Sequence, residues 1–170
     1  IRAKGIESLK IRVKDPGMRD DLTILRQVRA EVGDDIQIGV DANQGWPVSL
    51  IDPNPKWTLE YAKRFADGCA DLDIAWIEEP LDMHDWDGMV ALREHSKVPI
   101  SGAELLGDWH ELRAVIERGC LDKLQPDCTF AGGLTVAKQC MDACAERGLH
   151  YSPHTWSNGV GFLINLQLYA

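Results

Sequence analysis

Residues 20–41 read DDLTILRQVRAEVGDDIQIGVD, a stretch that predicts a helix followed directly by a strand. Apolar side chains recur at helical spacing, at Leu22, Leu25, Val28 and Val32. Gly33 follows, as is typical of a helix C-terminus, and the pair Asp34-Asp35 leads into the apolar run 36–41. A helix that gives way at once to a short apolar strand is the repeating unit of α/β folds.

The same unit recurs along the chain. Strands are expected at six short runs, Ser8–Val13, Ile36–Asp41, Ile74–Glu78, Ile100–Ala103, Lys123–Gln125 and His150–Ser152. Helices are expected at the segments that follow them, Asp20–Val32, Thr58–Gly68, Asp85–His95, Trp109–Arg118, Leu134–Arg147 and Gly159–Tyr169. This alternation predicts parallel strands joined by right-handed crossovers.

A doubly wound sheet and a (β/α) barrel both fit the alternation. No glycine-rich phosphate loop follows the first strand, which disfavours a dinucleotide-binding sheet. The pair Gly132-Gly133 before a helix is interpreted as a tight turn. A complete barrel needs about 250 residues, so we expect the 170 residues to form a partial barrel. The proline-rich segment 47–57 is interpreted as a loop inside this domain.

The composition excludes several classes of protein. A net charge of −9 argues against nucleic-acid binding, which requires a basic surface. The five cysteines include no CxxC pair, which is typical of reduced thiols in a cytoplasmic protein, and Cys140 and Cys144 are interpreted as small buried side chains. No apolar run reaches the roughly 18 residues that a membrane span requires.

Polar residues lie at or just beyond the C-terminal ends of five predicted strands: Asp41, Glu78, Glu104, Asp127 and His154. In a parallel barrel these ends meet at one mouth, where active sites lie. Three carboxylates brought together without a cation would repel one another, and Mg²⁺ suits a set of oxygen ligands. The residues alone leave open whether the acids form a metal site or a solvated rim, and whether the histidine is catalytic or a packing residue.

Five segments, taken in order, resemble successive motifs of the enolase superfamily in its mandelate racemase-like branch. They are 41–46 (DANQGW), 76–80 (WIEEP), 102–104 (GAE), 125–127 (QPD) with 132–133 (GG), and 152–154 (SPH). One such motif is weak, but five in order are specific. The resemblance implies that 1–170 is a C-terminal barrel domain fragment holding about six of the eight TIM-type βα units, from strand 2 to strand 7. The N-terminal capping domain would then lie outside this chain.

The resemblance also implies a metal site and its chemistry. Asp41, Glu78 and Glu104 would bind Mg²⁺, Glu78 being the first of two adjacent glutamates. Lys10 would lie near the substrate carboxylate. The metal and this lysine would offset the negative charge of the enediolate that forms when the α-proton of a carboxylate leaves.

The resemblance further implies that Asp127 and His154 form a dyad, in which the carboxylate orients the imidazole as a base. The first strand departs from the family pattern. Lys10 and Arg12 alternate onto the same face, and the branch commonly has lysine at both positions, the second being a base. Arg12 stays protonated, which makes it a poor base but a good clamp for a carboxylate or hydroxyl. An alternating surface strand is the other interpretation of this pair.

These features favour a reaction on one face of the substrate. His154 would abstract the α-proton and then, as imidazolium, protonate a departing β-hydroxyl. The expected activity is therefore dehydration of a sugar acid to a 2-keto-3-deoxy acid. A racemase or epimerase, a cycloisomerase, and a catalytically silent metal-binding barrel remain as alternatives. The muconate-cycloisomerase-like branch is disfavoured because it would place a lysine where this chain has Asp127.

The remaining expectations concern the rim of the mouth and the partners. Asn43 either binds a substrate hydroxyl or serves as a turn residue. Four tryptophans are interpreted as structural, namely Trp46, Trp76, Trp109 and Trp156. The expected partner is a small carboxylate substrate, and barrels of this branch often assemble as homo-oligomers.

Overall fold

The structure is a computed structural model that describes residues 4–13, 18–46, 56–156 and 158–169. Strands and helices alternate throughout this part of the chain. The strands are β1 (Ser8–Arg12), β2 (Gln37–Asp41), β3 (Ile74–Glu78), β4 (Ile100–Gly102), β5 (Lys123–Leu124) and β6 (His150–Tyr151). The helices are α1 (Met18–Val32), α2 (Leu59–Ala70), α3 (Trp86–His95), α4 (Trp109–Arg118), α5 (Leu134–Glu146) and α6 (Gly159–Tyr169). Most of the predicted loop 47–57 lies outside the described residues.

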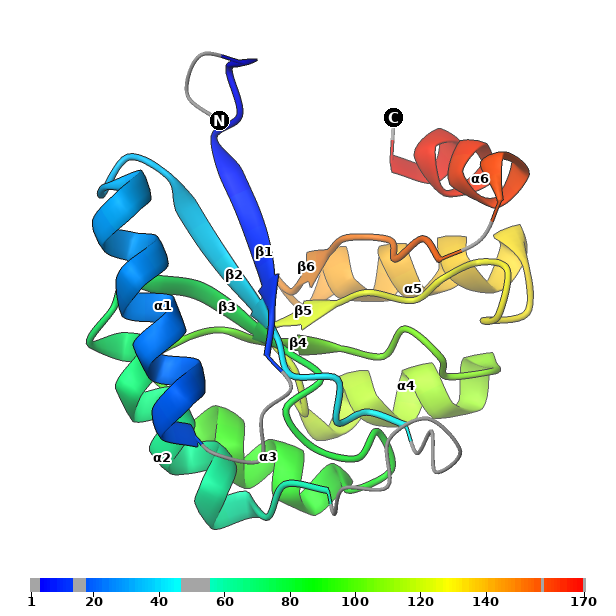
Figure 1. The fold of residues 1–170 in the computed structure, drawn as a ribbon. Coiled ribbons are helices and arrows are strands. Elements are labelled where there is room, and N and C mark those ends of the chain that lie inside the picture. Colours follow the sequence, from blue (N-terminus) through cyan, green and yellow to red (C-terminus); the bar gives the residue numbers. More distant parts are fainter. Residues whose placement is uncertain (1–3, 14–17, 47–55, 157, 170) are drawn as a thin grey trace.

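The described strands form one parallel sheet in the order β1-β2-β3-β4-β5-β6, so each strand pairs with the next one along the chain. A doubly wound sheet reverses its strand order at a switch point, whereas a barrel does not. The sequential order therefore confirms the prediction of a partial barrel. Figure 1 shows α1 to α5 lying around the outside of the curved sheet.

The core lies between the sheet and these helices. Alternate residues of β2, Ile38 and Val40, are buried, as are Leu25 on α1 and Phe65 on α2. Consecutive helices also pack against one another, from α1 with α2 to α5 with α6. Because the apolar side chains face outward to the helices, the inner face of the sheet is left for polar groups, and this arrangement positions the site.

A glycine on β2 makes room for a large side chain inside the barrel. A Cβ atom at Gly39 would overlap the indole ring of Trp76, which lies on the neighbouring strand. The ammonium of Lys123 on β5 lies 4.3 Å from the centre of the same ring. The indole and this lysine therefore fill the interior below the strand ends, as side-chain layers do in barrels of this type.

The ends of the helices differ from the predictions by one or two residues for identifiable reasons. Thr58 and Asp85, predicted to be the first helical residues, are N-caps whose side chains accept from the N–H groups of Tyr61 and Gly88. Gly33 has a positive φ of 71°, which suits the left-handed conformation expected after a helix. Several strands are one residue shorter than predicted.

The last helix, α6, presents apolar side chains to solvent. Exposed large side chains on it are Val160, Phe162, Leu163, Leu166 and Tyr169. Its buried residues are Gly161 and Asn165. Among the described residues, no helix is both long enough and apolar enough to cross a membrane.

Candidate active site

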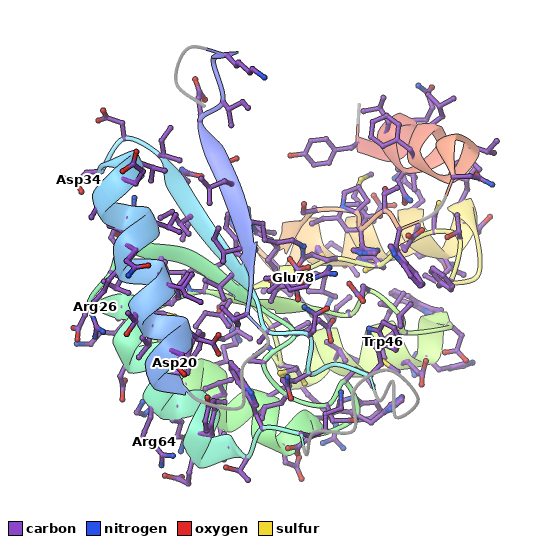
Figure 2. The ribbon with its side chains drawn as sticks, in the orientation of Figure 1. Asp20, Arg26, Asp34, Trp46, Arg64 and Glu78 are labelled. Atoms are coloured by element: carbon purple, nitrogen blue, oxygen red, sulfur yellow. The ribbon has the colours of Figure 1, made fainter. Side chains whose placement is uncertain are left out.

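The five polar residues at or just beyond the strand ends come together at the same edge of the sheet. Asp41 and Glu78 are the last residues of β2 and β3, and the register pairs them side by side. Glu104 lies just beyond β4, Asp127 beyond β5 and His154 beyond β6. Figure 2 shows Glu78 near the centre of the molecule, whereas charged residues such as Arg26 and Arg64 lie on the outer helices.

Lys10 and Arg12 point from β1 toward two of these acids. The ammonium of Lys10 donates to Glu78 Oε1 and lies 3.6 Å from Asp41 Oδ2. The Nη2 atom of Arg12 lies 3.2 Å from the same Asp41 oxygen, although the arginine side chain is 67% exposed. The two cations thus lie on one side of the strand, as their alternation predicts, and only the lysine is partly enclosed.

The carboxylate of Glu78 has two further donors. Gln125 donates from Nε2 to Glu78 Oε2 at 2.9 Å, and Trp76 donates from Nε1 to the same oxygen at 3.4 Å. Both of its oxygens are therefore engaged, and the side chain is buried. These contacts fix the orientation of the acid before any ligand is considered.

Glu104 lies between an indole and an imidazole. Trp46 donates from Nε1 to Glu104 Oε1 at 2.9 Å, and His154 Nε2 lies 3.1 Å from Glu104 Oε2. Burial raises the pKa of Glu104; the charge of His154 and the hydrogen bond from Trp46 act to lower it, while the charges of Asp41 and Glu78 add to the rise. The site therefore favours a positive charge beside this carboxylate.

His154 and Asp127 lie within contact distance, as the dyad requires. The Nδ1 atom of His154 is 3.3 Å from Asp127 Oδ2, and the ring is mostly enclosed. Since Nδ1 faces this carboxylate, Nε2 is the nitrogen that faces the acids at the mouth. A base held in this way presents one defined nitrogen to a substrate.

Asp127 is buried and accepts hydrogen bonds on both oxygens. Thr129 donates through its N–H and hydroxyl at 3.0 and 2.7 Å, Asn165 at 3.0 Å, and the N–H of Trp156 at 3.1 Å. Burial acts to raise the pKa of Asp127, but the bonds from Thr129, Asn165 and Trp156 together place it below its usual value. The aspartate therefore stays ionised and can stabilise a positive charge on the neighbouring imidazole of His154.

Asn43 forms a local turn. Its φ is 51°, its N–H donates to Asp41 Oδ1 at 3.1 Å, and its amide group lies 3.5 Å from the Asp41 carbonyl oxygen. These contacts support the interpretation as a turn residue. Its binding of a substrate hydroxyl stays a prediction.

Four residues beyond those predicted for the site also lie at it. The indole of Trp46 donates to Glu104, the backbone N–H of Trp156 donates to Asp127, and the two rings lie 6.2 Å apart, contacts that agree with the structural role expected of both tryptophans. Asn165 reaches the site from α6, where it stands among exposed apolar residues; a buried amide in an otherwise apolar helix is a usable signal. Glu79 is buried beside the acids.

The donor set fits a hard divalent cation. Asp41, Glu78 and Glu104 supply only carboxylate oxygens, which Mg²⁺ prefers. The ammonium of Lys10 already bridges two of these acids. As the side chains stand, no group of three His, Cys, Asp or Glu residues in the described part of the chain is arranged to hold a metal ion. Lys10 contacts Glu78, and His154 contacts Glu104.

The structure is a partial barrel with acids at the carboxyl ends of its strands and a histidine–aspartate pair beside them. A family model described as enolase C-terminal domain-like matches residues 1–170. The chain belongs to this family, within the enolase superfamily, as the resemblance implied.

Named relatives extend this result. The chain is 32% identical over 153 residues to the L-talarate/galactarate dehydratase of Salmonella typhimurium, covering 90% of the chain and 36% of that protein. It is 28% identical over 169 residues to the D-galactarolactone cycloisomerase of Agrobacterium fabrum, covering 99% of the chain and 42% of that protein. The chain thus spans less than half the length of either relative.

A solved structure agrees with these matches. The crystal structure of L-talarate dehydratase from Polaromonas sp. JS666, complexed with Mg and L-glucarate, has a TM-score of 0.81 and 28% sequence identity to this chain. The similarity covers 95% of the chain and 41% of that protein. Enzymes that bind sugar acids therefore share this fold, and one of them does so with magnesium.

Proposed function

We propose that the protein containing this chain is a Mg²⁺-dependent enzyme that removes the α-proton of a carboxylate substrate, and that its substrate is a sugar acid that loses water. The contact of His154 with Asp127 carries the proposal, because it leaves Nε2 facing the acids at the mouth. The named dehydratase relative and the magnesium-bound structure support it.

The metal ligands proposed are Asp41, Glu78 and Glu104. When bound there, Mg²⁺ would supply positive charge against the developing charge on the substrate carboxylate. The imidazole of His154 contacts Glu104 here, and in the proposed reaction it faces the substrate instead. Lys10 would then pass from the acids to the substrate carboxylate.

The proton steps fall to His154. In the proposed reaction Nε2 takes the α-proton, and the electron pair of the broken C–H bond stays on the substrate as an enediolate. The imidazolium then gives the proton to the β-hydroxyl, the C–O bond breaks, and water leaves. The resulting enol tautomerises to a 2-keto-3-deoxy acid. Asp127 stabilises the imidazolium between the two steps.

Arg12 is proposed as a substrate clamp. Its guanidinium lies 3.2 Å from Asp41 and is largely exposed, so it can reach a hydroxyl or a second carboxylate at the mouth. A protonated arginine does not serve as the second base that a two-base racemisation requires. This position therefore favours elimination on one face.

The test is proton exchange and product formation in the complete protein. Incubation with aldonic and aldaric acids in D₂O should give 2-keto acids from at least one of them. His154→Asn should abolish both the exchange of the α-proton and the keto acid, a loss of at least about 10³-fold. His110→Asn, on an exposed position of α4, is the matched control and should leave the rates unchanged. Unchanged turnover in the first variant would refute the assignment of the base.

A cycloisomerase is the second candidate, favoured by the relative from Agrobacterium fabrum. It would exchange the α-proton of its product without net loss of water and without accumulating a keto acid. The deuterium experiment separates the two, since mass spectrometry reads exchange and dehydration in the same sample. Magnesium binding with no exchange from any acid would indicate a silent metal-binding barrel.

A further inference from the structure

Glu79, the second acid of the 76–80 segment, is a buried carboxylate that the proposed reaction does not use. It is 2% exposed. Burial, and then the charge of Glu104, raises the pKa of Glu79 to about 8. Its neighbour Glu78 engages Lys10, whereas Glu79 engages the turn that follows β4.

That turn carries Glu104 and has an unusual backbone. Ala103 has a φ of 81°, in the left-handed region that residues other than glycine seldom adopt. The N–H of Ala103 donates to Glu79 Oε1 at 2.7 Å, and the N–H of Glu104 lies 3.4 Å from the same oxygen. The carboxyl group of Glu79 therefore stabilises the conformation that sets the direction of Glu104.

The backbone of Glu79 connects the neighbouring strand ends. Its N–H donates to the carbonyl of Ser101 at 2.9 Å, and its carbonyl accepts from the N–H of Gln44 at 2.7 Å. Glu79, which follows β3, therefore contacts the segments that follow β2 and β4. These are the three strands whose ends carry the acids.

Two glycines make room for this side chain. A Cβ at Gly45 would overlap Glu79 Oε2, and a Cβ at Gly102 would lie 2.8 Å from Glu79 Oε1. A contact that close requires a shift of one group, so the absence of side chains at both positions lets the carboxyl group enter between the two loops. The glycines and the glutamate fit together as one unit.

We propose that Glu79 is a positioning residue that holds the turn of Glu104 against the ends of β2 and β3, and so sets the spacing of the three acids. The proposal rests on the proposed function, because it takes these acids as the magnesium ligands. Glu79 acts as a hydrogen-bond acceptor, so an amide oxygen can replace its carboxyl oxygen. Outer residues of this kind typically change metal affinity by about 10–100-fold when replaced.

The test compares Glu79→Leu with Glu79→Gln in the complete protein. The leucine variant loses the acceptor and should raise the hydrogen-exchange rate of the Ala103 amide by about tenfold or more, whereas glutamine should keep it close to the parent. The backbone N–H of Gln125, which donates to the carbonyl of Gly102 rather than to Glu79, is the internal control for the exchange measurement. Calorimetric titration with Mg²⁺ should show weaker binding by about 10–100-fold for leucine and rescue by glutamine.

Each outcome decides a separate point. Unchanged exchange at Ala103 in the leucine variant overturns the proposal, as does equal loss of Mg²⁺ affinity in both variants. A parent protein that binds no Mg²⁺ refutes the proposed function, while the exchange rates still decide whether Glu79 holds the turn. If the leucine variant does not fold, Glu79→Asp supplies the comparison, because its shorter side chain withdraws the acceptor and should likewise raise exchange at Ala103.

Discussion

At the residue scale, Asp127 shows how a buried charge is stabilised in this site. It makes no direct contact with solvent, and its oxygens accept from Thr129, Asn165 and Trp156. These bonds outweigh the cost of burial, and the pKa of Asp127 lies below its usual value. A carboxylate with a depressed pKa stabilises the folded state at high pH and loses that contribution as the pH falls through the folded value.

This linkage predicts a pH-dependent effect of Asn165→Ala. Loss of the donor should lower the free energy of unfolding by about 2 kcal/mol at pH 7, since the bond is made to a charged group. Part of that difference arises from the pKa of Asp127, so it should shrink as the pH falls below about 4, the ordinary value for aspartate. Asn158→Ala is the control at the start of the same helix: Asn158, which precedes α6, accepts from the N–H of Val160, and the effect of its replacement should not vary with pH. Denaturant unfolding at several pH values measures both, and a constant difference for Asn165→Ala would contradict the linkage.

The residues of the site were only partly predictable. Asp41, Glu78 and His154 follow strands, so local pattern and family motifs find them. The contacts of Lys10 with two acids, of Trp46 with Glu104 and of Asn165 with Asp127 join residues far apart in the chain. Such contacts depend on which strands become neighbours, and no local spacing encodes them.

At the element scale, the strand ends position the candidate site residues, and the N-cap residues set where the outer helices begin. The fold was predictable at this scale because apolar runs and helix-ending glycines such as Gly33 repeat along the chain. The short strands β5 and β6 were overestimated by one residue each, although the N–H groups of Gln125 and Ser152 still donate to Gly102 and Leu124 of the neighbouring strands. The cap residues explain most differences at helix starts.

Asp108 gives a test at this scale. It is the N-cap of α4, and its side chain accepts from the N–H of Glu111 at 3.0 Å. Asp108→Ala should lower the free energy of unfolding by about 1 kcal/mol, whereas Asp108→Ser should retain most of it. Glu117→Ala, which removes only an exposed pair with Arg113 on the same helix, should change it by less than about 0.5 kcal/mol. Equal effects of the alanine variants in urea unfolding would show that the cap is not formed.

At the scale of the whole molecule, elements that follow one another in the described chain also lie next to one another in space. Strands follow one another across the sheet, helices follow one another around it, and α6 packs on α5. The outer face of α6 is apolar and exposed. An exposed apolar patch of this kind promotes association and dye binding in a domain studied by itself.

The 170-residue chain in isolation should therefore self-associate through this face. Replacing Phe162 and Leu163 with serine should reduce both light scattering and binding of a hydrophobic dye, and should leave the free energy of unfolding within about 0.5 kcal/mol, since both side chains are more than half exposed. Gln167→Ser, on an exposed polar position of the same helix, is the control. A monomeric parent chain that binds no dye would contradict this expectation.

The placement of a polar residue at or just beyond the ends of β2 to β6 has a consequence for how such proteins diversify. The helix-facing residues that hold the barrel together and the mouth residues that carry out chemistry occupy different positions in every unit. Arg12 lies at the mouth, apart from the packing around Ile38 and Phe65, so a substitution there leaves that packing intact. Residues at the strand ends can therefore change one at a time during evolution while the helix-facing core residues stay the same.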